Sequence, residues 1–292
     1  IHASELKQGY AAWAVRRGLP RDESALPWDF SGDITVAADT LIWAEATLQN
    51  VRGVARFTPG AVQLDDLVLG HGAGQLSGVG GYVSARDGSP AVLSTDLAVS
   101  GVDAVLLEGL FLEKARGLAG PMNGRVALTI PLVPESVSVM EHISGEITFE
   151  GKDGTLGKAG LASKLLGALR TTDILRLRIP QLKDKGLSFK TISGHVAIAQ
   201  GVFRVDPFNL SDSAYVLAGK ATFDYPKDTA EGGGEIQVLE GATGMARKIP
   251  ILGDAANLVS KVFGIPIKIS GTAKEPSFGV GVATPVKSTK SP

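Results

Sequence analysis

The chain of 292 residues contains no cysteine, few aromatic residues and few charges, and each shortage excludes a class of function. Without cysteine it has no disulfide and no thiolate ligand for structural zinc, and its four histidines lie far apart in the sequence. Aromatic residues make up 6%, too few for a row of stacking platforms for bases or sugars. The net charge of −1, without a basic block, argues against nucleic acid as a partner.

Long apolar runs and common enzyme motifs are also missing. No stretch of about 18 uncharged apolar residues is present, so no segment of this sequence is expected to span a membrane. The glycines between Gly70 and Gly81 are not followed by the Lys-Ser or Lys-Thr of a phosphate-binding loop, and no Gly-x-Ser-x-Gly elbow supplies a nucleophile. We therefore expect no enzyme activity, no cofactor and no metal. Asp65 and Asp66 leave a calcium pair open, although a turn after a strand is the preferred interpretation.

What the sequence does contain is a two-residue alternation of apolar and polar side chains, which is typical of strands with one apolar face. The expected fold is mostly β: an elongated, curved antiparallel sheet that forms an apolar groove and is built from tandem β repeats. A few short helices are expected over 4–17, 103–118, 156–170 and, near the C-terminus, 250–263, with Asp103 capping the second. Pro207 is expected to end a strand, and residues 231–234 to form a loop.

Two segments repeat each other at a constant offset of 141 residues. The segment that starts at Leu48 aligns with the one that starts at Phe189 without a gap, and glycines fall in register. These glycines are Gly53 with Gly194, Gly60 with Gly201 and Gly78 with Gly219. Repeats of one supersecondary unit predict an array in which each unit packs against the next.

The repeats suggest a division of the chain into four parts. Residues 1–30 are expected to form a helix and a connector, and 31–150 a first β-repeat unit. Residues 151–282 are expected to form a second β-repeat unit with the C-terminal helix, and 283–292 a flexible tail.

The apolar strand positions are the candidate binding site, because side chains of one parity can line a continuous apolar path. The expected lining residues are Ile34, Val36, Phe57, Val62, Leu64, Val126, Leu128, Ile147, Phe149, Val196, Ile198, Phe203, Val205, Leu217, Phe223, Ile236 and Val238. The same alternation also suits the inner face of a β-sandwich. A structural or adhesive β-array with a closed core and no lipid path is therefore the alternative.

Three blocks of the chain resemble the C-terminal region of AsmA-like proteins, in the YhdP branch of that family. The first block holds Lys185–Phe189, Ile192–Gly194 and Gly201–Asp206, the second is Leu217–Ala221, and the third holds Ile249–Gly253, Ser260–Gly264 and Ile269–Thr272. Leu41–Val51 resembles the upstream repeat of the same family. The resemblance spans most of the chain and rests on the order and spacing of these blocks.

The resemblance implies a function in the cell envelope of Gram-negative bacteria. AsmA-like proteins are similar to bridge-like lipid carriers, which are anchored in the inner membrane and extend through the periplasm. Their sheet forms a groove along which phospholipid acyl chains move towards the outer membrane. This chain would be a C-terminal, periplasmic part of such a conduit, with the anchor in a segment that it lacks. The family has no catalytic residues to carry over.

Three cations flank the expected C-terminal helix and are candidates for membrane contact. Arg247 and Lys248 precede the helix and Lys261 lies near its end. At the outlet of a conduit they would touch anionic head groups, each contributing roughly 1 kcal/mol near an anionic surface. The alternative is a helix that only caps the end of the sheet.

Overall fold

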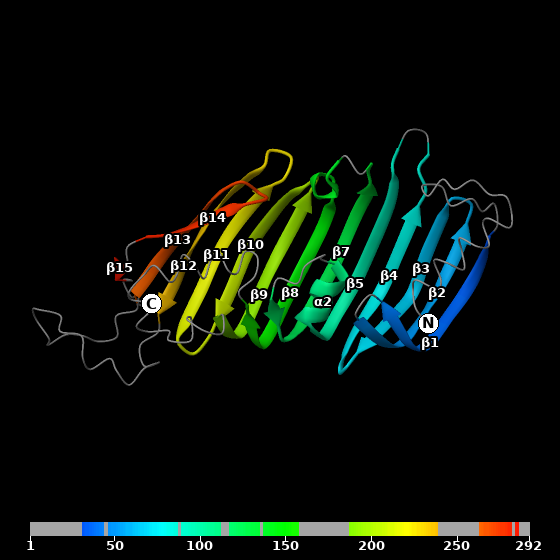
Figure 1. Cartoon of the computed structure of the whole chain (residues 1–292), viewed down its shortest axis with the longest axis horizontal. Coiled ribbons are helices and arrows are strands. Elements are labelled where there is room, and N and C mark those ends of the chain that lie inside the picture. The colour runs from blue at the N-terminus through cyan, green and yellow to red at the C-terminus, as the bar shows by residue number, and fades with distance from the viewer. Residues whose placement is uncertain are drawn as a thin grey trace, which may run out of the picture. The chain divides into compact units, whose positions relative to one another are not determined.

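The computed structural model describes residues 31–43, 46–86, 89–111, 117–134, 137–157, 187–238, 263–281 and 284–285. Strands dominate these residues, which also hold one α-helix and one short 3-10 helix. The strands belong to one antiparallel sheet that is not closed (Figure 1). The expected mostly β, antiparallel fold is therefore confirmed.

The bounds of the elements follow the alternating segments of the sequence. The elements are β1 (Gly32–Trp43), β2 (Ala46–Thr58), β3 (Ala61–His71), β4 (Gly74–Val83), β5 (Ala91–Asp103), α2 (Ala104–Phe111), β6 (Leu118–Ala119), β7 (Pro121–Leu132), η1 (Val139–Glu141), β8 (Ser144–Leu156), β9 (Leu187–Ala199), β10 (Val202–Ser211), β11 (Tyr215–Asp224), β12 (Thr229–Val238), β13 (Phe263–Gly271), β14 (Pro276–Val280) and β15 (Thr284–Pro285). In the sheet, β1 to β5 and β7 to β14 follow chain order, while β6 pairs with β8 and β15 with β13.

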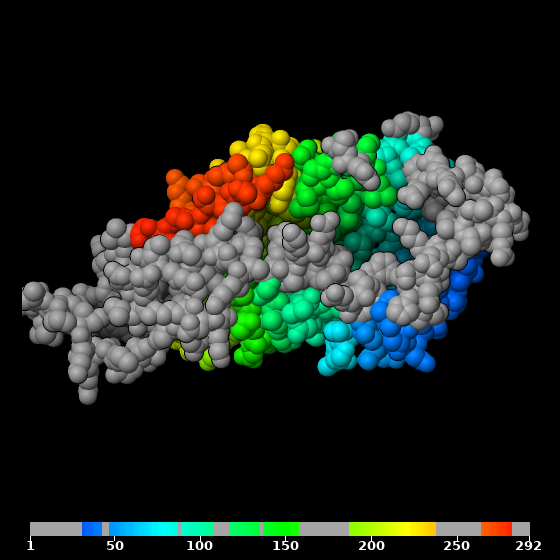
Figure 2. Space-filling model, viewed as in Figure 1, coloured from blue at the N-terminus to red at the C-terminus, as the bar shows by residue number. Residues whose placement is uncertain are grey.

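The strands divide between two compact units. Unit 1 holds β1 to β5, α2, β7, the part of β8 up to Phe149, and residues 196–202. Unit 2 holds β6, the rest of β8, most of β9, and β10 to β15. In unit 2, β13 and β14 lie beside each other, orange and red in Figures 1 and 2.

Two strands continue past residues that the sequence predicts as strand ends. Strand β3 bulges at Asp65 and Asp66, where its pairing with β4 shifts register between Leu64 and Leu67 and the φ angle of Asp66 is 51°. The expected turn after the strand is wrong, because the bulge absorbs the extra residue and the strand continues. Strand β10 likewise runs through Pro207, whose peptide bond with Asp206 is cis, so Pro207 does not end it.

The loop expected over 231–234 is also wrong, because β12 runs through these residues. Gly232 pairs with Ala221, and Gly234 pairs with Gly219. A β-carbon on Gly234 would lie 2.4 Å from the carbonyl oxygen of Ala218. These glycines therefore mark a close approach of two strands rather than a loop.

The helices agree with the sequence only in part. Helix α2 begins where expected, and its cap is confirmed by the Val105 amide, which donates to Oδ1 of Asp103 at 2.9 Å. Leu118, the expected end of this helix, belongs instead to β6. Leu156 and Phe263, expected at helix ends, lie in strands β8 and β13. Gly157, also expected in a helix, has no regular secondary structure. The other residues of those two helices, and the helix expected over 4–17, lie outside the described residues.

Candidate functional site

Cross-strand register in unit 1 places apolar side chains on one side of the sheet, named here the apolar face. Directly paired residues point to the same side of a sheet. One row of paired residues consists of Ile34, Ala55, Leu64, Gly80, Thr95 and Leu128. Phe57 pairs with Val62 and shares the parity of this row, as do Val36 and Val126. The seven expected lining residues on β1, β2, β3 and β7 therefore share one face.

Part of the apolar face is closed by α2. Leu106 of the helix is 7% exposed and belongs to a core cluster of buried side chains from the sheet. The other members are Leu48, Val51, Leu76, Val99 and Val102, and Ala38, Leu41, Leu69, Leu107 and Val126 pack against them. This part of the face is an ordinary packed core.

The rest of the apolar face is open. Five of its large side chains are exposed: Ile34 at 51%, Val36 at 45%, Leu64 at 37%, Leu93 at 39% and Leu132 at 40%. Leu93 pairs with Tyr82, which pairs with Val62 of the apolar face. Leu132 shares this face because its partner Ala91 lies two residues along β5 from Leu93. Several exposed apolar side chains on one face mark a surface that binds something apolar.

Four further expected lining residues lie on β8 and β9 within unit 1. Ile147, Phe149 and Val196 are partly buried, whereas Ile198 is only 5% exposed. A charge at Ile198 would therefore be buried and would disturb packing, so this position cannot test a lipid path by itself.

Unit 2 has an apolar face of its own, and it is more buried. Leu217 pairs with Ile236, and Ile236 pairs with Ile265, the last two being fully buried at 0% exposure. Phe223 pairs with Ala230, and Val238 occupies the register position opposite Tyr215. On β10, Val205 is partly buried, and the ring of Phe203 lies 5.3 Å from that of Tyr225 in an edge arrangement. The remaining expected lining residues thus lie in this unit.

The opposite side of unit 1, named here the polar face, carries ion pairs. Arg56 lies 3.4 Å from Asp33 and 3.3 Å from Asp65. Nε of Arg125 donates to Oδ1 of Asp96 at 2.6 Å. This hydrogen bond and the guanidinium charge lower the pKa of Asp96, and Asp96 in turn raises the pKa of Arg125. The two faces of unit 1 therefore differ sharply in polarity.

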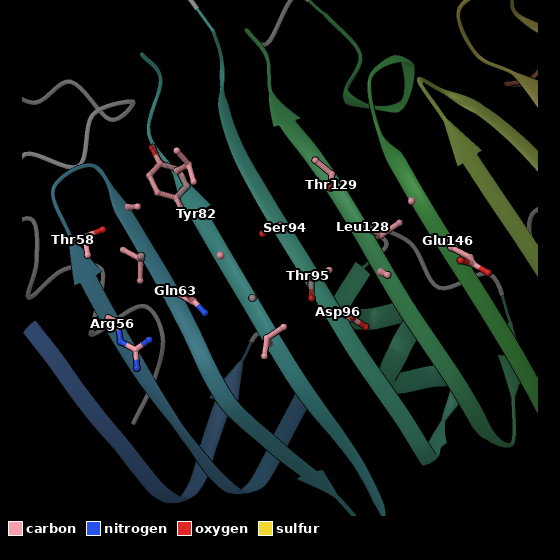
Figure 3. A pocket seen from close by; sticks show the side chains of 18 of the residues that line it. Arg56, Thr58, Gln63, Tyr82, Ser94, Thr95, Asp96, Leu128, Thr129 and Glu146 are labelled. Carbon is pink, nitrogen blue, oxygen red and sulfur yellow. The ribbon is translucent and has the colours of Figure 1, made fainter. Parts of the chain in front are cut away.

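A hollow of about 740 Å³ is lined by residues of both parities (Figure 3). Most of them, such as Arg56, Gln63 and Ser94, belong to the polar face, and the expected groove residues Val62, Leu128 and Ile198 line it as well. One row of paired residues crosses it: Arg56, Gln63, Gly81, Ser94 and Thr129. A second hollow, of about 720 Å³, shares Val79 with it. This hollow was not predicted from the sequence, although small and hydroxyl-bearing residues at the polar positions of β4, β5 and β7 are its signal. The groove expected on the apolar face stays a prediction.

Asp65 and Asp66, the pair that could hold calcium, lie at the bulge of β3. Within the described ranges, no three His, Asp or Glu residues gather into a group that could hold a metal ion. Asp65 is bonded to Arg56 and to Nε2 of Gln63, the latter at 2.7 Å. No helix in the described part of the chain is long and apolar enough to cross a membrane. Arg247, Lys248 and Lys261 lie outside the described residues.

No family model matches this chain, and neither a curated protein nor a solved structure is similar enough to it to count as a relative. The resemblance to AsmA-like proteins therefore stays a prediction.

Proposed function

We propose that this chain is part of a periplasmic lipid-transfer conduit, in which phospholipid acyl chains lie against the apolar face. The observation that carries the proposal is the contrast between the two sides of unit 1. Ile34, Val36 and Leu64 are exposed on one side, while Arg56 and Arg125 form ion pairs on the other. Covering apolar surface with acyl chain is favourable by about 0.8 kcal/mol for each buried methylene.

A repeated unit is the second part of the proposal. Strand β2 begins at Ala46 and β9 at Leu187, and β4 begins at Gly74 and β11 at Tyr215, so each pair is separated by 141 residues. Buried positions correspond as well: Leu48 with Phe189, Val51 with Ile192, and Leu76 with Leu217. This correspondence supports tandem units, which can supply apolar surface over a long distance.

The envelope setting rests on the resemblance to AsmA-like proteins. It includes an anchor in the inner membrane outside this chain, transfer of phospholipid between inner and outer membrane, and no catalytic step. The absence of cysteine is compatible with a periplasmic location but does not require one.

A closed β-array without a lipid path is the second candidate, and one observation favours it. The core cluster around Leu106, and the fully buried Ile236 and Ile265, show that parts of both apolar faces are already packed. If all of the apolar surface were covered by protein in the same way, nothing would remain for a lipid.

Native mass spectrometry of the protein purified from a Gram-negative host separates the two candidates. The conduit predicts co-purifying phospholipid, and the closed array predicts the mass of the protein alone. Val36→Asp is the test variant, and Val79→Asp is its control, because these valines are 45% and 44% exposed on opposite faces of unit 1. A carboxylate against an acyl chain is costly, so Val36→Asp should lower lipid occupancy by about tenfold. Absence of lipid, or equal occupancy in both variants, would refute the conduit.

A further inference from the structure

The hollow of unit 1 has the size of a ligand site, and most of its lining residues belong to the polar face, opposite the proposed lipid path. Its volume of about 740 Å³ falls within the range of small-molecule sites. Gly81 forms the floor, because it places no side chain between Gln63 and Ser94, its direct neighbours on β3 and β5. We propose that this hollow binds a neutral oligosaccharide.

Charge excludes an anionic ligand. Arg56 is held by Asp33 and Asp65, so its guanidinium is already neutralised. Arg125 is held by Asp96, which is the main cause of its raised pKa, and Glu146 adds to the same effect. The charged residues that line the hollow are Arg56, Asp96 and Glu146, so the acids outnumber the arginine there and an uncharged ligand is favoured over a phosphate or carboxylate.

Hydroxyl groups supply the hydrogen-bonding capacity for sugar hydroxyls. Thr58, Ser94 and Thr129 line the hollow, and their side chains appear as sticks in Figure 3. Among the described residues, no hydrogen bond engages the hydroxyls of these three side chains. Each hydroxyl can both donate and accept, as can each sugar hydroxyl.

Exposed aliphatic side chains supply the other half of sugar recognition. Val79 and Val83 line the hollow and are 44% and 53% exposed. They can pack against the C–H groups of a sugar ring. Because Val79 also lines the second hollow, the surface continues beyond one site, which suits an oligomer better than a single sugar. An open surface predicts weak binding, with a Kd of about 1 mM.

Methyl NMR titration of the whole chain with maltotetraose and with tetra-N-acetylchitotetraose tests the proposal. The methyl signals of Val79 and Val83 should shift and saturate with at least one of the two sugars. The double variant Ser94→Ala, Thr129→Val removes two hydroxyls with little change of shape. It should weaken binding by about tenfold, as expected for two lost neutral hydrogen bonds.

A second variant fills the floor of the hollow. In Gly81→Val the closest atom to the new β-carbon would be Oγ of Ser94, at 2.9 Å. This side-chain atom can rotate away, so the strand should still fold while the valine blocks binding. Gly279→Val is the control, because a β-carbon there meets nothing within 4 Å. Thermal unfolding checks that each variant is folded. The proposal is overturned if neither sugar shifts Val79 and Val83, or if binding survives in both the double variant and Gly81→Val.

Discussion

Helix α2 should depend on Leu106 for its attachment to the apolar face. The helix has eight residues, and an isolated helix shorter than about 12–15 residues is only marginally stable in water. The helix is therefore held to the sheet by packing. Leu106 is the helix residue that belongs to the core cluster, and it is only 7% exposed. Leu106→Ala should lower the free energy of unfolding by about 3 kcal/mol, from lost transfer energy and the cavity that remains.

Urea titration followed by circular dichroism measures this change, and Val105→Ala on the same helix is the matched control. Val105 is 53% exposed, so its truncation should alter the free energy of unfolding by less than about 0.5 kcal/mol. Detachment of α2 would also uncover the core cluster, so binding of an apolar fluorescent dye should increase in Leu106→Ala alone. Equal costs for the two variants, or a cost below about 0.5 kcal/mol for Leu106→Ala, would refute this account of the helix.

Three further outcomes are expected. Asp103→Ala should cost about 1 kcal/mol in urea titration because the Val105 amide loses its acceptor, and Asp103→Asn should restore most of it. Tyr215→Phe should cost about 1–3 kcal/mol, because the buried phenol donates to the Ser188 carbonyl. Burial, with the charge of Asp212, raises the pKa of Tyr215. The phenol therefore contributes its full stabilisation below about pH 10, and this stabilisation is lost as pH rises towards the pKa of the folded state. Tyr215→Phe should lack this alkaline loss of stability in pH-dependent unfolding. Removal of bound lipid should lower the melting temperature, because a ligand at a free concentration of 100 times its Kd stabilises the folded protein by about 2.7 kcal/mol. An unchanged melting temperature would contradict the conduit.

The strands and their faces could be predicted because alternation is a local property of the sequence. A strand with apolar residues at every second position, such as Ile34 and Val36 or Phe203 and Val205, is predicted to have one apolar side whatever strand lies next to it. The cap at Asp103 is local too, since it needs only an acceptor directly before the helix.

Other features could not be predicted because they depend on the neighbouring strand. From the sequence, Gly232 and Gly234 are typical of a loop. In the structure they lie in a strand, and the backbone of β11 is so close that no side chain fits there. The polar hollow needs the register that brings Gly81 between Gln63 and Ser94, which lie on separate strands. Pattern alone gives no register between strands.

Exposure of single residues does not decide between a conduit and a closed array, because Val36 and Val79 are almost equally exposed. What differs is their surroundings. Val79 pairs with Asp96 and lies two residues along β4 from Ser77 and from Gly81, so its nearest neighbours on that face are polar or small. Val36 lies two residues along β1 from Ile34 and shares its face, and the row of Ile34 continues through Ala55 to Leu64, so the exposure of Val36 is part of an apolar surface. A closed array has to bury such a surface with protein, whereas a conduit has to keep it accessible to acyl chains. Contiguity of exposed apolar residues on one face, rather than their number, is therefore the property that favours the conduit.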